Sequence, residues 1–245
     1  MKKKTEKRMN HFLAIIIAIF VVIATYFNID VEQYLIESGI IEPRNIPQVL
    51  SFDIHEIPEF SGEPYVLINN NMPNFPIEDY QKGAFEEYSE LDDLGRCGVA
   101  YACVGKETMP TEERGDIGMV KPSGWQTKKY NCVDGKYLYN RCHLLGYQLT
   151  AENANKENLI TGTRYLNVTG MLPFENEVAD YVKDTGNHVL YRVTPIFDGE
   201  DLVAKGVQME ADSVENDEVC FNVYVYNVQP GVVIDYVTGK SKLAK

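Results

Sequence analysis

The chain has 245 residues, of which 44% are hydrophobic and 24% charged, and this composition excludes collagen, coiled coils and wholesale disorder. A globular domain of moderate size is the default for this length. The formal net charge of −13 argues against a protein that coats nucleic acid through its overall field. It does not exclude a small basic site within an acidic surface.

The first ten residues form a basic tip, and an apolar segment follows them. The tip has a charge of about +4, so the remaining chain carries about −17. Residues 12–27 contain no charge, and this length lies between the core of a signal peptide and a full membrane span. We expect an uncleaved transmembrane signal-anchor over residues 11–27, with a cleaved signal peptide as the alternative. The positive-inside rule then places residues 1–10 in the cytoplasm and the remaining chain outside the cell.

The cysteines do not have the pattern of a disulfide framework or of a zinc site. Their number is odd, so at least one thiol is unpaired. No CxxC pair exists, and the spacing of Cys97 and Cys103 is poor for metal ligands. We expect mainly buried thiols with at most one or two disulfides. The cysteines are Cys97, Cys103, Cys132, Cys142 and Cys220.

Residues 28–60 contain scattered prolines and acids without a sustained period, which is typical of a stalk. A folded domain is expected from residue 61. Its first half has apolar runs at residues 65–68, 99–104 and 136–139 that predict strands, with turn residues at 69–74. Residues 85–94 have a weak helical pattern.

The second half predicts one helix followed by several strands. Pro173 begins the helix, apolar residues recur at helical spacing, and Gly186 stands where a helix commonly ends. Residues 188–197, 202–209, 219–228 and 232–237 follow as strand candidates. This order predicts an α+β fold in which helices pack on an antiparallel β-sheet core.

Histidine is scarce, and only His143 lies in a dense polar context. Asn140 and Arg141 precede it closely, directly after a predicted strand. An imidazole can take a proton from water near neutral pH, and an arginine beside it can hold an anionic group. His188 begins a predicted strand, where a structural role is expected.

Three segments together resemble the DNA/RNA non-specific endonucleases, a family of ββα-metal (His-Me finger) nucleases. They are Asn140-Arg-Cys-His-Leu-Leu-Gly-Tyr147, Asn158-Leu-Ile-Thr-Gly-Thr-Arg-Tyr-Leu-Asn167 and Phe174-Glu175-Asn176. The resemblance runs from about residue 62 to 239. It implies an endonuclease domain over residues 61–240, with a ββα-metal finger at its active site and a tail at 241–245.

The resemblance also implies the catalytic roles. His143 is then the general base that activates water, and Asn167 is the direct protein ligand of a hydrated Mg²⁺, for which Mn²⁺ can substitute. Glu175 holds waters of the metal shell, and Arg141 steadies the phosphate. One neutral amide ligand suits Mg²⁺, which keeps most of its waters. The substrates are DNA and RNA without sequence specificity, and the products carry 5′-phosphates.

Two residues depart from the pattern of the family. Asn140 stands where the motif usually has Asp, and Cys142 where it usually has Gly. An amide at position 140 can still orient the histidine, but it stabilises the imidazolium less well than a carboxylate. A disulfide between Cys132 and Cys142 across a hairpin is an open alternative.

Basic residues around the motif are candidates for a groove that follows the phosphates of the substrate. They are Lys121, Lys128, Lys129 and Arg164. A solvated lysine face is an equal alternative for Lys128 and Lys129. Trp125, which lies among them, is expected in the core rather than as a stacking platform.

The sequence therefore predicts an extracellular, Mg²⁺-dependent, sequence-non-specific endonuclease, held at the cell membrane or secreted if the signal is cleaved. The alternative is a weakened nuclease fold that serves as a surface module and binds nucleic acid or a protein partner. Asn140 and Cys142 favour that alternative, whereas the joint presence of His143, Asn167 and Glu175 argues against it.

Overall fold

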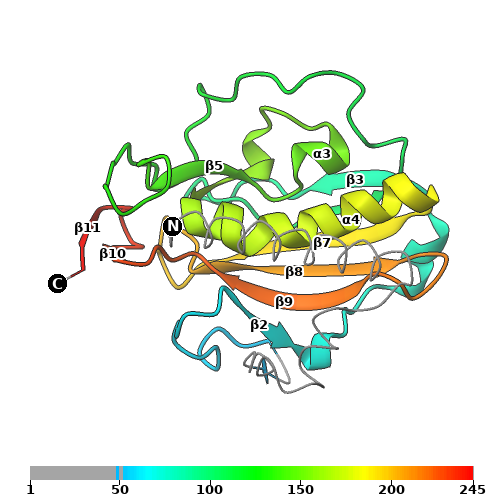
Figure 1. Cartoon of the computed structure of the whole chain (residues 1–245), viewed down its shortest axis with the longest axis horizontal. Helices are drawn as coiled ribbons and strands as arrows, with labels where there is room; N and C mark the ends of the chain where they lie inside the picture. The colour runs from blue at the N-terminus through cyan, green and yellow to red at the C-terminus, as the bar shows by residue number, and fades with distance from the viewer. Residues whose placement is uncertain (1–47, 50–51, 245) are drawn as a thin grey trace, which may run out of the picture. The chain divides into compact units, whose positions relative to one another are not determined.

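The structure, a computed structural model, describes residues 48–49 and 52–244 (Figure 1). The predicted basic tip, signal-anchor and most of the stalk lie outside the described residues. Among the helices of the described part, none has both the length and the apolar character needed to cross a membrane.

A seven-stranded sheet forms the centre of the described domain, in the order β1-β2-β9-β8-β7-β4-β3. β1 and β2 are parallel, and the other neighbouring pairs are antiparallel. The expected α+β class with a largely antiparallel sheet is confirmed. The strands are β1 (Gln48–Val49), β2 (Tyr65–Ile68), β3 (Phe85–Tyr88), β4 (Ala100–Val104), β7 (Val189–Ile196), β8 (Gly206–Ser213) and β9 (Cys220–Tyr226).

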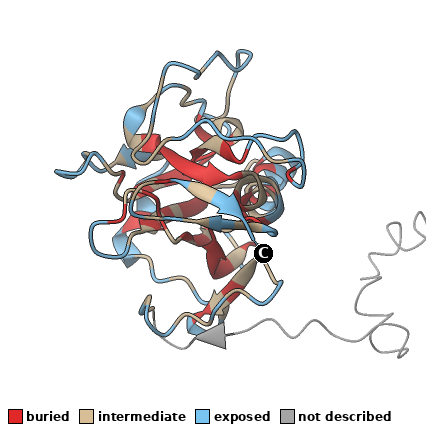
Figure 2. Ribbon diagram, turned by 90° about the vertical axis from the view of Figure 1, so that its left-hand side faces the viewer, coloured by how far each residue is buried: buried red, intermediate tan, exposed pale blue. Residues whose placement is uncertain are grey.

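Helix α4 (Leu172–Thr185) packs on one face of this sheet (Figure 1). Val178 and Val182 of its apolar stripe are fully buried in the same core cluster as Tyr191 of β7. Proline lies in the first turn, and Gly186 ends the helix in the left-handed conformation with φ 77°, as predicted. Buried residues concentrate in the sheet and in α4, whereas the peripheral loops are exposed (Figure 2).

A second, two-stranded sheet consists of β5 (Tyr139–His143) and β6 (Leu159–Thr163), which pair antiparallel. The short helices α3 (Tyr147–Thr150) and η3 (Lys156–Asn158) lie in the connection between them. A π-helical segment, η4 (Leu166–Met171), follows β6 and runs directly into α4. β5, β6 and α4 thus form the ββα unit that the resemblance implies.

Buried amide side chains join this ββα unit to its surroundings. The Oδ1 atom of Asn227, which has no exposed surface, accepts from the backbone N–H of Thr163 at 2.9 Å. Its Nδ2 atom donates to the carbonyl oxygens of Thr161 and Ala204. Because a buried unpaired amide is expensive, this complete set of partners fixes β6 relative to the large sheet.

The remaining elements are short. The helices η1 (Asn69–Asn71) and η2 (Ile77–Gln81) follow β2, and β10 (Val232–Ile234) pairs antiparallel with β11 (Ser241–Leu243). The predicted turn at 69–74 is confirmed, because Asn69, Asn70 and Asn71 all have positive φ.

Some boundaries and one element type differ from the sequence prediction. The helix predicted within residues 85–94 is wrong, because Phe85–Tyr88 is the edge strand β3. Phe85 and Tyr88, at the two ends of β3, are three residues apart, a spacing that also occurs on one face of a helix. The ring of Phe85, however, packs edge-to-face on the ring of Tyr101 in the neighbouring strand, with 5.1 Å between the ring centroids. Pairing with β4 overrides the weak local pattern. The strand predicted at 136–139 begins only at Tyr139, because Lys136 lies in a turn with φ 68°.

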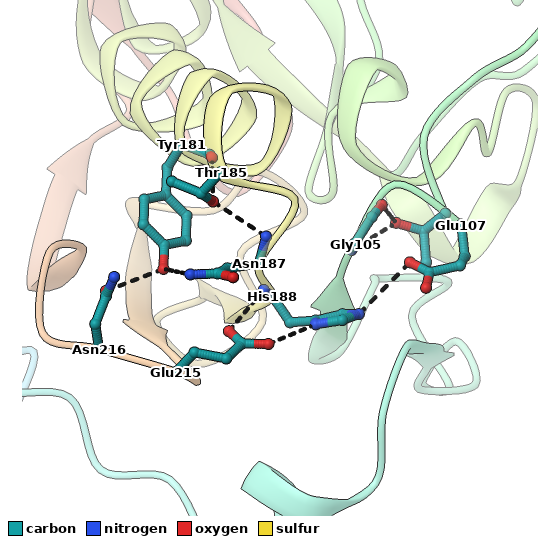
Figure 3. Close-up of polar contacts among 9 residues, drawn as sticks. Gly105, Glu107, Tyr181, Thr185, Asn187, His188, Glu215 and Asn216 are labelled. Carbon is teal, nitrogen blue, oxygen red and sulfur yellow. Dashed lines mark hydrogen bonds and ion pairs between the residues drawn. The ribbon is translucent and has the colours of Figure 1, made fainter.

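A long segment, residues 105–120, crosses from the end of β4 toward β5, and we call it the strap (Figure 1). Side chains from elsewhere hold it in place. Tyr147 of α3 donates to the carbonyl oxygen of Glu112 at 2.8 Å. Glu107, at the start of the strap, lies beside His188, which directly precedes β7, with 3.5 Å between Nε2 of His188 and Oε2 of Glu107. Nδ1 of the same ring lies 2.8 Å from Oε1 of Glu215 (Figure 3). The structural role expected for His188 fits this position.

The five cysteines are all free thiols. Cys142 is completely buried and Cys132 is exposed, so the alternative of a disulfide between them is wrong. The expectation of buried structural thiols holds for Cys97, Cys103 and Cys142.

Candidate active site

His143 is the last residue of β5, and only 6% of its surface is exposed. Burial lowers the pKa of the imidazole to about 4; the nearby charge of Arg114 adds to this effect, whereas the hydrogen bond to Asn153 opposes it. The ring is therefore neutral at neutral pH. This is the form that can accept a proton.

The hydrogen bonds of His143 select one tautomer. Nε2 lies 2.7 Å from the carbonyl oxygen of Asn153. A carbonyl oxygen only accepts, so Nε2 carries the proton of the neutral ring and Nδ1 has the free electron pair. Nη2 of Arg114 donates to Nδ1 at 3.2 Å. Nδ1 is thus the basic atom, and in this structure its electron pair accepts the hydrogen bond from Arg114.

Arg114 belongs to the strap, and sequence patterns do not single it out. It stands in an exposed stretch between Glu113 and Asp116, which is typical of a solvated loop. The contacts that hold the strap bring its guanidinium to His143. Only this tertiary placement identifies Arg114 as a member of the site.

Asn167 lies in η4, where the π-helical turn precedes α4. Its Oδ1 atom accepts a hydrogen bond from the thiol of Cys142 at 2.9 Å. Cys142 is fully buried, and burial raises the pKa of its thiol well above the ordinary value. The sulfur is therefore a neutral donor, and Oδ1 keeps a second electron pair for another partner.

Glu175 lies in the first turn of α4, as predicted, and its carboxylate lies against Gly146. A Cβ atom at Gly146 would come within 2.8 Å of Oε2, so a residue with a side chain would displace the carboxylate. Burial raises the pKa of Glu175 to about 7, and the charge of Arg114 opposes this. Among the described residues the carboxylate has no hydrogen bond or ion pair, and a bound cation would favour its ionised form.

Arg141 points toward the strap. Its Nε and Nη2 atoms donate to the carbonyl oxygens of Val120 and Gly118, the latter at 2.6 Å. The guanidinium also covers the ring of Trp125, 4.1 Å from its centroid. Two of its donor atoms are thus engaged with protein, and Nη1 is available to a phosphate. Trp125 packs on a small apolar cluster but is only half-buried and lines the cavity, so it is not the core residue that the sequence predicts.

Asn140 pairs with Gly162 in the β5–β6 ladder and is half-buried. Within the described part of the chain its side chain makes no hydrogen bond. Asn140 and Asn167 both line a cavity on this side of the domain. Asn140 does not hydrogen-bond to His143, whose ring nitrogens contact Asn153 and Arg114.

This cavity has a volume of about 620 Å³ and is lined by Arg114, Ile117, Trp125, Thr127, Tyr137, Tyr139, Asn140, Arg141, Arg164 and Asn167. Arg164 is the one predicted substrate contact in this set, and it forms an ion pair with Asp134 at 2.9 Å. Lys121, Lys128 and Lys129 are exposed outside the lining. Lys129 lies over the ring of Tyr137, 4.2 Å from its centroid.

The polar groups of the site fit a hydrated hard cation better than a closed metal cage. In the part of the chain that the structure describes, no group of three His, Cys, Asp or Glu residues could hold a metal ion. The available oxygen donors in the described residues are the side-chain amides of Asn167 and Asn140 and the carboxylate of Glu175. Oxygen donors of this number suit Mg²⁺, which retains several waters, and do not suit a structural zinc site.

A ββα unit with a buried neutral histidine, next to a cavity lined by an amide oxygen and three arginines, fits a phosphodiesterase. The sequence model of the DNA/RNA non-specific endonucleases matches residues 77–215, and the chain belongs to this family. It is an endonuclease, a hydrolase of the phosphodiester bonds of nucleic acid.

Solved nuclease structures have the same fold. NucA from Streptococcus agalactiae with magnesium bound is 25% identical, with a TM-score of 0.69 over 78% of this chain and 93% of NucA. The Sda1 nuclease with bound zinc is 24% identical, with a TM-score of 0.61 over 80% of this chain and 100% of Sda1. A protein described as an extracellular endonuclease is 20% identical, with a TM-score of 0.53 over 69% of this chain and 89% of its own.

Proposed function

We propose that this endonuclease cleaves DNA and RNA without sequence specificity, uses Mg²⁺, and employs His143 as its general base. The observation that carries the proposal is the geometry of His143. Its Nε2 atom is held on the carbonyl oxygen of Asn153 at 2.7 Å, which leaves Nδ1 as the proton acceptor beside a cation. A buried neutral imidazole in this tautomer suits the removal of a proton from water.

The arginines bind the anionic groups of the reaction. Arg114 donates to Nδ1 in this structure, so a water reaches Nδ1 only when the guanidinium turns from the ring to a phosphate, and that phosphate then lies next to the water. The positive charge of Arg114 also stabilises the negative charge that develops on the phosphate oxygens in the transition state. Arg141 keeps the strap in position through two carbonyl oxygens and offers Nη1 to the same phosphate.

Asn167 and Glu175 would hold the metal, Asn167 directly through Oδ1 and Glu175 through waters. When bound, Mg²⁺ would stabilise the charge of the phosphate and of the leaving 3′ oxygen. The magnesium ion in NucA from Streptococcus agalactiae supports this choice of metal, and the zinc ion in Sda1 leaves Mn²⁺ or Zn²⁺ to be tested. Because the bond between phosphorus and the 3′ oxygen breaks, the products carry 5′-phosphate ends.

We also propose that the domain acts outside the cell. The basic tip and apolar segment at residues 1–27 support a signal-anchor, and the fold is shared with a protein described as an extracellular endonuclease. Mass spectrometry of the amino terminus of the mature protein separates an intact anchor from a cleaved signal peptide. A protein found only in the cytoplasm would contradict this localisation.

A cleavage assay on plasmid DNA and on a long RNA tests the chemistry. We expect cutting in Mg²⁺ and none after EDTA, and we expect His143→Ala to lose most of the rate. His55→Ala makes the same change at an exposed histidine outside the site and serves as the control. No cutting by the wild type in Mg²⁺, Mn²⁺ or Zn²⁺ would overturn the proposal, and undiminished cutting by His143→Ala would overturn the assignment of the base.

A further inference from the structure

The cavity beside Asn167 extends to groups that the proposed chemistry does not use. Its volume of about 620 Å³ is within the range of pockets for small organic ligands. Besides the catalytic candidates, its lining includes Tyr137 and Arg164. These two residues offer an aromatic ring and a cation in one place.

Tyr137 presents its ring to solvent, with 48% of the residue exposed. A turn with positive φ at Gly135 and Lys136 precedes it, and an isolated bridge pairs its backbone with Lys129. The ammonium of Lys129 lies 4.2 Å from the ring centroid. Both the backbone pairing and the cation–π contact keep the ring in a defined position before any ligand binds.

The other aromatic residues of the lining are more buried than Tyr137. Trp125 is covered by the guanidinium of Arg141, 4.1 Å from the ring centroid. Tyr139 is 4% exposed, and its hydroxyl donates to the carbonyl oxygen of Gly239. Tyr137 is therefore the most exposed aromatic ring of this lining, and a ligand would use the face of the ring that Lys129 does not cover.

Arg164 supplies a cation that can change partners. Its backbone N–H donates to the carbonyl oxygen of Leu138 at 2.8 Å, which fixes its position. Its guanidinium pairs with Asp134, whose side chain is 80% exposed. Exposed ion pairs contribute little, so a phosphate can replace the carboxylate of Asp134.

From these contacts we propose that the cavity binds one unpaired nucleotide of the substrate next to the cleaved bond. Its base stacks on Tyr137, and a phosphate on the same strand binds Arg164. Within a duplex both faces of a base are covered by its neighbours, so only an unpaired or displaced base can use this ring. The enzyme accordingly binds single strands more tightly than duplexes. This inference rests on the proposed function, because it takes nucleic acid as the ligand of this site.

Binding is measured on the full chain carrying His143→Ala, so that the substrate is not cut. The probes are a fluorescein-labelled single-stranded oligonucleotide and the same strand annealed to its full complement as a blunt duplex, each followed by anisotropy in Mg²⁺. Added to this background, Tyr137→Ala is expected to weaken single-strand binding by roughly fivefold to a hundredfold, the range for loss of one stacked base. Duplex binding should change less than twofold, and Tyr137→Phe should restore single-strand binding.

Two further variants control the result. Arg164→Met removes the charge and should weaken the binding of both probes, whereas Ile77→Ala removes an exposed apolar side chain outside the cavity and should change neither. Unchanged single-strand binding by Tyr137→Ala, or an equal loss on both probes, would overturn the inference. If the wild type cuts plasmid and only this binding difference is absent, the proposed function stands and the nucleotide site fails.

Discussion

The thiol of Cys142, which is fully buried, donates a hydrogen bond to Oδ1 of Asn167, a half-buried residue, at 2.9 Å. Cys142 occupies the position where the family usually has glycine, and Gly162 on the paired strand makes room for it. A Cβ atom at Gly162 would lie 2.7 Å from Cβ of Cys142. The departure from the motif is thus accommodated, and it adds a donor that orients the amide.

This contact predicts that Cys142 affects metal affinity. Cys142→Ser keeps a donor and should bind Mn²⁺ nearly as well as the wild type. Cys142→Ala leaves the amide free to rotate and should weaken binding by roughly tenfold, as for other residues that orient a metal ligand. Isothermal titration with Mn²⁺ measures this directly, without turnover. An affinity of Cys142→Ala equal to that of the wild type would show that the thiol has no such effect.

The low pKa of His143 predicts how the imidazole titrates. Burial disfavours the charged ring, so it should stay neutral as the pH falls from 7 and take up a proton only near pH 4. An NMR titration of the metal-free protein follows the ring, and His143→Gln assigns its signals. Circular dichroism at each pH is the control for unfolding. A midpoint near 6.5 in the folded protein would contradict the burial argument.

Removal of Arg114 should change both the rate and two pKa values. Its charge lowers the pKa of His143 and of Glu175, so both pKa values should rise in Arg114→Ala. The rate should fall by about 10²–10³, as for loss of one group that stabilises the transition state. Arg114→Lys keeps the charge without the planar fork and should retain the pKa values but not the full rate. If Arg114→Ala cuts DNA at the wild-type rate, Arg114 does not contribute to catalysis.

The contact of His188 with Glu215 and Glu107 predicts a pH-dependent contribution to stability (Figure 3). The hydrogen bond to Glu215 is the main cause of a raised pKa of His188. A raised pKa in the folded state means that the contribution is fully present below pH 6.5 and is lost as the pH rises through the folded value. His188→Gln should therefore lower Tm more at pH 6 than at pH 9.

Thermal denaturation monitored by circular dichroism tests this difference, and His55→Gln is the exposed control. An equal decrease of Tm in His188→Gln at both pH values would indicate that packing, rather than the charge of His188, stabilises this end of the strap.

Local patterns in the sequence predicted the elements whose residues carry strong signals. Pro173 marks the first turn of helix α4 and Gly186 its end. The apolar run at 65–68 is β2. Phe85–Tyr88 was assigned the wrong type, because the pairing partner of an edge strand lies elsewhere in the chain and leaves no local signal.

For the site, the sequence by itself predicts the motif residues His143, Asn167 and Glu175, because they lie within one continuous ββα unit whose pattern resembles a known family. Only the tertiary structure decided that Arg114, in an acidic exposed stretch, lies 3.2 Å from Nδ1 of His143, and that Tyr137 and Arg164 line one cavity. Loop residues have few local constraints, and contacts with distant segments decide where they lie. The acidic net charge therefore describes the sequence as a whole, whereas only the tertiary structure gathers Arg114, Arg141 and Arg164 around one cavity, where we propose that the substrate binds.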